Sequence, residues 1–237
     1  MSSSIFRFKQ FNVIQQNTAM KIGTDGVLLG AWADYSDPKS ILDIGTGTGL
    51  IALMLSQRFD KSKVTAVEID EVAAEEAKLN FKNSAWKDCL SILNMDFFEM
   101  DSTVKYDMLV CNPPYFKSDQ RSPDKKRALA RNGIFSAPTF LSKANSLMHN
   151  KSQISFILPF DQLDSYDEEA QMLGLKRSKT LFVKPTNQKP PNRVLVNFVN
   201  SETELPVNDN YLIIEEGERH NYSEGYKKLT SDFYLKF

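Results

Sequence analysis

The residues with the clearest chemical potential form the tetrapeptide Asn112-Pro113-Pro114-Tyr115. An amino group on a planar ring is a poor nucleophile, because its lone pair is delocalised. The Asn112 side-chain carbonyl and the Pro113 main-chain carbonyl can accept its two hydrogens, which turns the lone pair towards an electrophile. The prolines fix φ and hold these acceptors ready, and Tyr115 can stack on a planar target. The tetrapeptide predicts substitution at a planar amino group, although alone it is also typical of a strand-ending turn.

A glycine-rich loop, Asp43-Ile44-Gly45-Thr46-Gly47-Thr48-Gly49, precedes this tetrapeptide in the chain. Glycines at alternate positions allow a tight turn and let a ligand approach the backbone closely. The G-x-G-x-G spacing departs from the dinucleotide fingerprint, because Leu50 stands where that pattern has its third glycine. A pyrophosphate needs the exposed N-terminus of a helix, whereas S-adenosylmethionine has no phosphate. The loop therefore favours S-adenosylmethionine over a dinucleotide.

Two acidic residues stand at the ends of the next two predicted strands. Glu68 lies 19 residues after Gly49 and can accept hydrogen bonds from both hydroxyls of a ribose. Asp96 can accept from an adenine amino group, and the neighbouring Phe97 can flank the base. Either acid alone would equally suit a solvated turn. Because the loop and the acids follow successive strands in order, we predict the following cofactor contacts: Asp43, Gly45, Gly47, Gly49, Glu68, Ile69, Asp96, Phe97 and Asn112.

These residues depend on an alternation of strand and helix patterns that begins near Ser40. Apolar runs predict strands at 41–44, 64–69, 90–94, 106–111 and 154–158, and helices at 50–58, 70–83 and 138–149. This alternation is typical of a parallel sheet with helices on both faces. Residues 175–183 and 193–200 follow as two directly connected strands, which indicates an antiparallel pair. We predict a doubly wound α/β fold, with a mostly parallel seven-stranded sheet and a C-terminal antiparallel strand pair, typical of methyltransferases.

The 237 residues suffice for one domain with a complete core. Within this single domain we expect an N-terminal segment at 1–35 that packs over the cofactor site, a Rossmann-like core at 38–200, and a C-terminal extension at 201–237. In the first segment Asp25 stands where the N-cap of a helix is expected, and the aromatic residues before it suit a short strand or an arm.

Composition excludes several classes of protein. The formal net charge of -1 argues against a uniformly basic nucleic-acid binder. Cys89 and Cys111 lack CxxC spacing and are expected to be buried, reduced thiols. His149 and His220 have no partner at metal-ligand spacing, so we expect surface histidines and no metal. No apolar window approaches the roughly 20 residues that span a bilayer, and residues 1–10 lack the core of a signal peptide. We expect a cytoplasmic protein without a membrane partner.

A basic segment follows the tetrapeptide directly. Six cations stand against Asp119 and Asp124, a local charge of +4: Lys117, Arg121, Lys125, Lys126, Arg127 and Arg131. A second, sparser group contains Lys189 and Arg193. Both groups are predicted to contact RNA phosphates, and a target base would have to be splayed out to reach Tyr115. A solvated charged loop is the alternative for the first group.

The DIGTGTG loop, the sequence VEID at 67–70 and the NPPY tetrapeptide together resemble class I methyltransferases that act on amino groups. More narrowly, residues 8–11 (FKQF), 20–32 (MKIGTDGVLLGAW), 189–196 (KPPNRVLV) and 222–234 are similar to the bacterial tRNA1(Val) (adenine-37-N6)-methyltransferase family. The resemblance covers nearly the whole chain. One departure is Arg131-Asn132-Gly133, where that family commonly has Arg-His-Glu. The departure lies in the segment assigned to RNA recognition and leaves the methyl-transfer residues unchanged.

This resemblance implies methylation of an adenine N6 atom in tRNA, at position 37 of tRNA1(Val), with S-adenosylmethionine as the methyl donor. It implies that Asn112, Pro113 and Tyr115 hold the adenine. It also implies that the segment from Lys21 through Thr24 to Asp25 lies near the methionine end of the cofactor. We expect a monomer with a tRNA substrate.

Three alternatives use the same residues. A glutamine methyltransferase of protein release factors would bind a planar amide in the same way, but it normally has a helical domain where this chain has 42 residues before Asp43. An RNA guanine N2-methyltransferase would also bind its target in this way. The third alternative is a non-catalytic RNA-binding or S-adenosylmethionine-sensing protein on the same fold.

Overall fold

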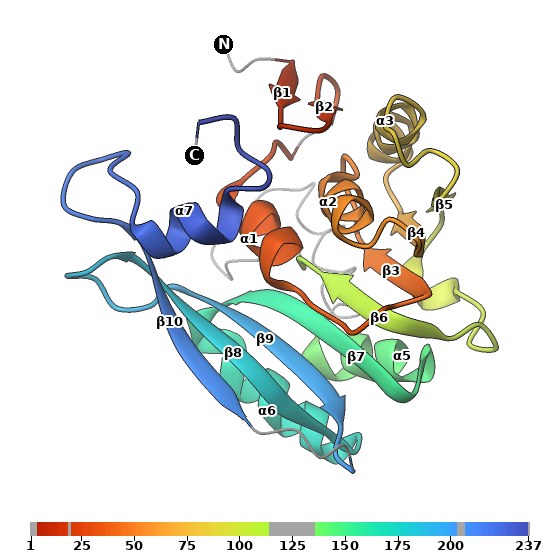
Figure 1. Ribbon diagram of the computed structural model, residues 1–237. Helices are drawn as coiled ribbons and strands as arrows, with labels where there is room; N and C mark the ends of the chain where they lie inside the picture. Colours follow the sequence, from red (N-terminus) through yellow and green to blue (C-terminus); the bar gives the residue numbers. More distant parts are fainter. Residues whose placement is uncertain (1–3, 19, 114–135, 203–206, 237) are drawn as a thin grey trace, which may run out of the picture.

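The computed structural model describes residues 4–18, 20–113, 136–202 and 207–236. Its centre is an eight-stranded sheet with the order β10-β8-β9-β7-β6-β3-β4-β5 (Figure 1). Within it, β9 runs antiparallel to β7 and β8, and the other neighbouring strands are parallel. The strands are β3 (Ser40–Ile44), β4 (Lys63–Glu68), β5 (Leu90–Asn94), β6 (Tyr106–Cys111), β7 (Met148–Pro159), β8 (Leu175–Thr186), β9 (Arg193–Asn200) and β10 (Asn208–Glu215).

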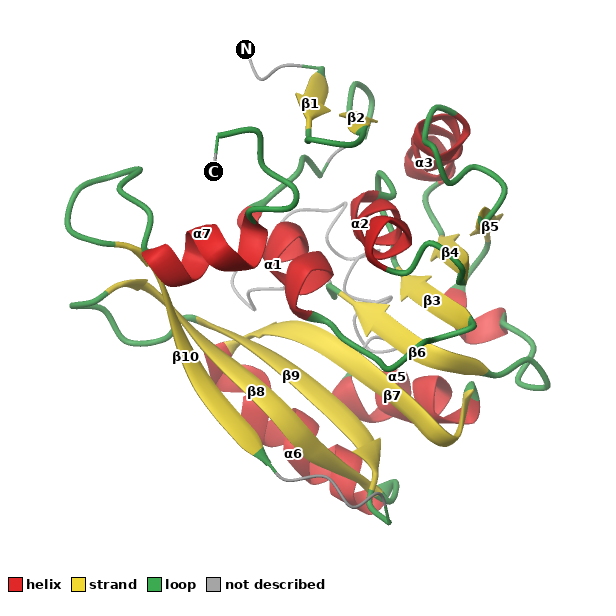
Figure 2. Cartoon of the chain, viewed as in Figure 1, coloured by secondary structure: helices red, strands yellow, loops and turns green. Residues whose placement is uncertain are grey.

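Helices cover both faces of this sheet (Figure 2). One face carries α1 (Thr24–Trp32), α2 (Leu50–Arg58), α3 (Glu71–Lys82) and α7 (Glu224–Thr230). The other carries α5 (Ala137–Ser146), α6 (Leu163–Met172) and the 3-10 turns η1 (Phe97–Glu99) and η2 (Phe160–Gln162). A small hairpin of β1 (Ile5–Arg7) and β2 (Asn12–Ile14) precedes α1. Each helix of the described residues is too short or too polar to cross a lipid bilayer.

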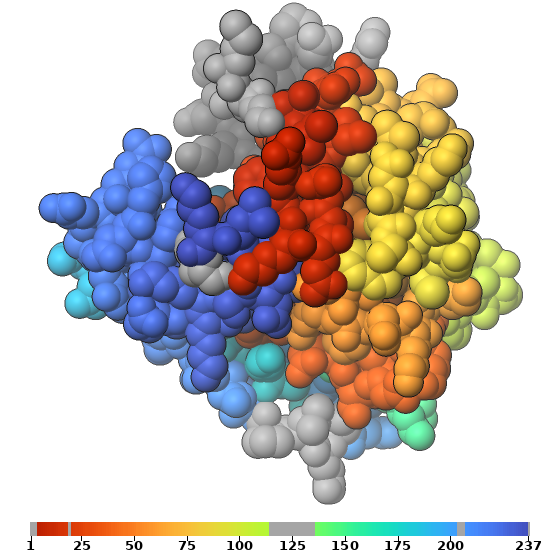
Figure 3. All heavy atoms as spheres, turned by 45° about the horizontal axis from the view of Figure 1, so that its top comes forward, coloured from red at the N-terminus to blue at the C-terminus, as the bar shows by residue number. Residues whose placement is uncertain are grey.

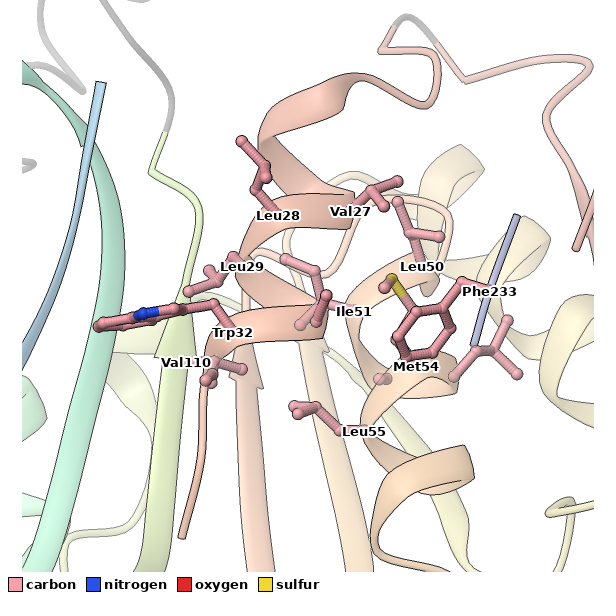
Figure 4. Close-up of a cluster of buried hydrophobic side chains, with 14 of the residues drawn as sticks. Val27, Leu28, Leu29, Trp32, Leu50, Ile51, Met54, Leu55, Val110 and Phe233 are labelled. Carbon is pink, nitrogen blue, oxygen red and sulfur yellow. The ribbon is translucent and has the colours of Figure 1, made fainter. Parts of the chain in front are cut away.

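The two faces of the sheet bury two separate hydrophobic cores. Alternate residues of one strand point to opposite faces, so Leu195 joins the core under α1 and α2, while Val194 and Val196 join the core under α5 and α6. In α1, every residue from Gly26 to Trp32 is buried. Figure 4 shows its apolar side chains against those of α2, with Val110 of β6 below them. The first core therefore fixes α2, which begins where the glycine-rich loop ends.

The predicted doubly wound α/β fold is confirmed, but the sheet has eight strands instead of seven. The additional strand is β10, which pairs in parallel with β8 at the edge of the sheet. An edge strand has only one neighbouring strand and is therefore less buried, so its sequence can be less apolar. The first four residues of β10 are exposed. The antiparallel β8–β9 pair is as predicted, with β8 extending to Thr186.

Several predicted boundaries are wrong. The helix expected at 138–149 ends at Ser146, and His149 lies inside β7. This strand has 12 residues, whereas the prediction gave it five, at 154–158. Its Nε2 atom lies 3.0 Å from Oδ1 of Asp107, so His149 belongs to a local contact. Asp25 is not an N-cap: α1 begins at Thr24 after Gly23. Cys111 is buried as predicted, but Cys89 is half-buried.

Candidate active site

The carboxyl ends of β5, β4, β3 and β6 lie side by side and place the predicted site residues at one edge of the sheet. Ile44 is paired with Val67 of β4 and with Cys111 of β6. From β3 the chain continues outward to β4 and β5, and then returns to the other side of β3 with β6. An open α/β sheet binds ligands in the crevice at such a reversal of strand order.

The glycine-rich loop directly follows β3 at this reversal. Its three glycines have positive φ values of 69°, 57° and 85° at Gly45, Gly47 and Gly49, a region that other residues rarely adopt. A Cβ atom at position 49 would lie 2.4 Å from Cε1 of Phe81, whereas one at 45 or 47 would meet nothing within 4 Å. The loop is therefore packed against α3 at its last glycine and open at its first two.

Glu68 at the end of β4 fixes the shape of this loop. Its Oε2 atom accepts a hydrogen bond of 2.9 Å from the backbone N–H of Gly47, and its Oε1 atom accepts one of 2.9 Å from that of Asp70. The side chain is half-buried, and Ile69 beside it is 56% exposed. A carboxylate oxygen has a second lone pair, so Glu68 keeps acceptor capacity for a ligand.

Asp43 lies beneath the same loop and is fully buried. Its Oδ2 atom accepts hydrogen bonds from Thr46 Oγ1 at 2.6 Å and from the Ala52 backbone N–H at 3.0 Å. Its Oδ1 atom is buried without a partner among the described residues. Burial is the main cause that raises the Asp43 pKa to about 7, and these hydrogen bonds oppose it. The site therefore contains one unused acceptor oxygen.

The turn after β5 differs in part from the expectation. Asp96 is half-buried and caps η1, with Oδ1 accepting a hydrogen bond of 2.9 Å from the Phe98 backbone N–H. Phe97 is only 6% exposed and stacks on Phe140 of α5, with 5.0 Å between the ring centroids. The structure places this ring in the second core, and its contact with adenine stays a prediction.

Asn112 and Pro113 follow β6 on the other side of the glycine-rich loop. Because Cys111 pairs with Ile44, the residues that follow them, Asn112 and Gly45, leave adjacent strands at the same level. Asn112 is half-buried and Pro113 is buried. Pro114 and Tyr115 lie outside the described residues, as do all of the predicted RNA contacts of the basic segment: Lys117, Arg121, Lys125, Lys126, Arg127 and Arg131.

Two polar residues of α3 that sequence reasoning missed hold the N-terminal segment against this edge. The Glu76 carboxylate accepts hydrogen bonds from three consecutive backbone N–H groups, those of residues 16, 17 and 18, at 2.7, 2.6 and 3.2 Å. Asn80 accepts one from Ile14 N at 2.8 Å and donates to Thr48 O in the glycine-rich loop at 2.9 Å. Their i and i+4 spacing among alanines places both on one face of α3, but the sequence alone shows neither their burial nor their partners.

The remaining predicted residues near the N-terminus are exposed. Lys21 donates through Nζ to the backbone carbonyls of Gln15 and Gln16, and Thr24 is the first residue of α1. In the second basic group Lys189 is exposed, whereas Arg193 donates from Nε to Oδ2 of Asp25 at 2.9 Å. This ion pair links β9 to α1, so Arg193 has a structural contact as well.

The described residues contain no group of three or more His, Cys, Asp or Glu side chains arranged to hold a metal ion. His220 lies exposed in a turn, as predicted.

A glycine-rich loop open to a ligand, at the strand reversal of a sheet that includes an antiparallel strand pair, defines the class I methyltransferase architecture. Solved structures agree on this fold. A predicted O-methyltransferase from Agrobacterium tumefaciens is similar with a TM-score of 0.68 and 19% identity, over 88% of this chain and 96% of the other. A ribosomal protein L11 methylase from Lactobacillus delbrueckii subsp. bulgaricus has a TM-score of 0.52 and 14% identity, over 75% and 78%.

Sequence comparison narrows the assignment. The model of the methyltransferase small domain family matches residues 17–150, more than half of the chain. A tRNA1(Val) (adenine(37)-N6)-methyltransferase of Bacteroides fragilis is 40% identical over the whole of both chains, and one of Trichodesmium erythraeum is 41% identical over the same extent. One from Vibrio campbellii is 37% identical over 98% of this chain and 95% of the relative. The chain belongs to the tRNA1(Val) (adenine(37)-N6)-methyltransferase family.

Proposed function

We propose that the protein transfers a methyl group from S-adenosylmethionine to N6 of an adenine in tRNA, at position 37 of tRNA1(Val). The observation that carries this proposal is the adjacency of the open glycine-rich loop and Asn112-Pro113 at the reversal between β3 and β6. Relatives that are 40% identical over their full length carry this activity in their names. A tRNA substrate would place the reaction in the cytoplasm.

The chemistry of the edge fits this cofactor. S-adenosylmethionine has an ammonium group, which can donate a hydrogen bond to an unused carboxylate oxygen, and Asp43 Oδ1 is a buried oxygen of this kind beneath the loop. Its ribose has two hydroxyls that suit Glu68, with the exposed Ile69 beside it as an apolar contact. When bound, the cofactor supplies an electrophilic methyl group on a charged sulfur. The full proposed set is Lys21, Thr24, Asp43, Gly45, Gly47, Gly49, Glu68, Ile69, Asp96, Phe97 and Asn112.

The protein's own contribution is to position the amino group. We propose that the Asn112 side-chain carbonyl and the Pro113 backbone carbonyl accept the two N6 hydrogens, so that positive charge developing on nitrogen faces two fixed dipoles. No ionisable base is needed, because the methylated nitrogen loses its proton readily. Burial raises the pKa of the neighbouring Cys111 thiol well above its usual value, so the thiol stays protonated and does not compete as a nucleophile.

Two further parts of the proposal concern the surroundings of the site. The N-terminal segment, held by Glu76 and Asn80, would pack over the cofactor and bring Lys21 to Thr24 near its methionine end. The cations of the basic segment at 117–131, with Lys189 and Arg193, would contact RNA phosphates. Stacking by Tyr115 would then hold the splayed adenine.

The test is an incubation of the protein with methyl-labelled S-adenosylmethionine and either unmodified total tRNA or a protein release factor. We expect N6-methyladenosine in one tRNA species after nuclease digestion. Labelled N2-methylguanosine would identify a guanine as the acceptor, and label on the release factor alone would identify a protein acceptor. Either result would contradict methylation of adenine. An absence of label on both, with S-adenosylmethionine bound, would favour a sensor.

A further inference from the structure

Three aromatic side chains form a continuous row on the surface, at the margin of the second core. We call Phe160, Phe182 and Tyr211 the aromatic row. The Phe160 and Phe182 ring centroids are 5.9 Å apart, and those of Phe182 and Tyr211 are 5.1 Å apart. Phe160 is 44% exposed and Tyr211 is 69% exposed, whereas Phe182 is half-buried against the second core. Contiguous exposed apolar area of this kind marks an interaction site more often than a scattered residue does.

The row crosses the sheet on the face that α6 covers. Tyr211 of β10 is paired with Phe182 of β8, so both side chains point to one face. Phe182 is paired with Val194 of β9, which lies in the second core. Phe160 opens η2 directly after β7. Packing alone does not explain the row, because its outermost ring, Tyr211, is mostly in solvent.

The row begins close to the proposed active site. Cys111 of β6 is paired with Phe156 of β7, so Asn112 leaves β6 at the level of Ile157. Phe160 lies three residues further along this direction. At about 3.3 Å per residue and about 4.8 Å between strands, that is roughly 10 Å along and one strand across. A polynucleotide whose target base lies at Asn112 could reach the row within a few nucleotides.

The charged residues on the two sides of the aromatic row differ in sign. On the side of the strand ends, Lys184 follows Phe182 by two residues on the same face, and Lys189 is exposed in the connection beyond it. On the opposite side, Asp209 precedes Tyr211 by two residues and contributes a negative charge near Asp167. An anionic backbone would therefore follow the lysine side, which is also the side of the active-site edge.

We propose that the aromatic row is a stacking platform for a nucleotide of the substrate RNA other than the target base, with Lys184 and Lys189 contacting the phosphates beside it. This inference rests on the proposed function, since it assigns a second contact region to the same RNA. Aromatic faces accept any base by stacking, and nearby lysines neutralise the backbone. The row thus binds RNA without reading its sequence.

The decisive variant is Tyr211→Ala, because this exposed side chain can be removed without opening the core. Stacking of one base corresponds to an affinity loss of about 5-fold to about 150-fold. We expect the Kd for tRNA to rise within this range at fixed salt, while the Kd for S-adenosylmethionine and kcat at saturating tRNA stay unchanged. Tyr211→Phe keeps the ring and should bind tRNA like the wild type. Met172→Ala removes another exposed apolar side chain, 75% exposed on α6, and is the matched control.

The lysines are tested through salt. In Lys189→Ala, the slope of log affinity against log salt should become shallower by about 0.7. An unchanged tRNA affinity in Tyr211→Ala overturns the platform, and self-association of the wild type that this variant abolishes would assign the row to a protein contact instead. Failure of the proposed function is seen separately: the wild-type protein would then produce no N6-methyladenosine in any tRNA.

Discussion

Asp43 carries both of its hydrogen bonds on one carboxylate oxygen, and the other oxygen is buried without a partner among the described residues. Burial raises the pKa of this carboxyl to about 7, and the charge of Glu68 adds to the increase. The folded state therefore binds a proton that the unfolded state releases near pH 4. The resulting stability is fully present below about pH 4 and is lost as the pH rises through about 7.

The variant Asp43→Asn tests this linkage. An amide oxygen in the place of Oδ2 keeps the hydrogen bonds from Thr46 and Ala52, but the group no longer titrates. We expect its free energy of unfolding to fall less than that of the wild type between pH 4 and pH 7, as measured by urea denaturation across this range. Asp37→Asn changes an exposed carboxylate and should keep the wild-type slope. Equal slopes for Asp43→Asn and the wild type would contradict the assignment.

The second prediction at the residue scale concerns the side chain of Asn112. Its side-chain carbonyl is proposed to accept one N6 hydrogen as charge develops, and removal of one such dipole from an active site costs about 100-fold to 1,000-fold in kcat. We expect Asn112→Ala to lose kcat for tRNA methylation in this range, while the KM for tRNA changes much less. Asn83→Ala, at the exposed end of α3, is the control. A full kcat in Asn112→Ala would exclude this role.

At the scale of elements, α3 does more than cover the sheet. One of its faces carries Glu76 and Asn80, which hold the N-terminal segment and the glycine-rich loop together through backbone groups. The loop, the segment and the helix are therefore one hydrogen-bonded unit. A substitution that disturbs this unit should weaken cofactor binding before it lowers the stability of the fold.

The variant Glu76→Gln disturbs it at one point. The amide nitrogen would face the Thr18 N–H in place of an acceptor oxygen, which removes a charge-assisted hydrogen bond, and such bonds contribute about 1.5–3 kcal/mol. We expect weaker binding of S-adenosylmethionine in calorimetry and faster proteolysis within residues 14–24. Glu75→Gln, an exposed neighbour paired with Lys78, should behave like the wild type. If Glu76→Gln bound S-adenosylmethionine with unchanged affinity and was cleaved at an unchanged rate, Glu76 would not couple the N-terminal segment to the cofactor site.

Elements of different types differ in how clearly the sequence predicts them. Strands β3, β4 and β6 lie between two layers of helices, so their apolar runs predict them to within a residue. The edge strand β10 and helix α6 were missed, because β10 begins with exposed polar residues and α6 buries only Leu163, Tyr166 and Ala170. Glu76 was missed for another reason. Its partners are backbone groups 58 to 60 residues away, and no local pattern encodes them.

The whole molecule is closed by contact between its two ends. The backbone N–H of Lys9 donates to the carbonyl of Phe233 at 2.8 Å, and Phe8 stacks on Tyr234 with 5.9 Å between the ring centroids. In Figure 3 the red N-terminal segment runs between the blue C-terminal segment and the yellow-orange region of α3. The C-terminal segment therefore supports the N-terminal segment, which in turn is bound to α3.

Phe233 is the anchor of this closure. Its side chain is 2% exposed and belongs to the first core, where Figure 4 shows it beside Met54 of α2. Truncation of a buried phenylalanine leaves a cavity and costs about 3–5 kcal/mol. We expect Phe233→Ala to lower the free energy of unfolding by this amount in urea denaturation. Leu235→Ala, two residues later and 58% exposed, should change it by less than about 0.5 kcal/mol.

A second measurement tests whether the contact between the two ends supports cofactor binding as well as the stability of the fold. Because α2 begins at the glycine-rich loop, a loosened C-terminal segment should also weaken cofactor binding under conditions where Phe233→Ala remains folded. We expect the Kd for S-adenosylmethionine to rise in this variant at low temperature, whereas Leu235→Ala keeps the wild-type value. If Phe233→Ala lost stability but bound the cofactor as tightly as the wild type, the contact between the two ends would serve the fold alone, and the hydrogen bonds of Glu76 and Asn80 would suffice to hold the N-terminal segment.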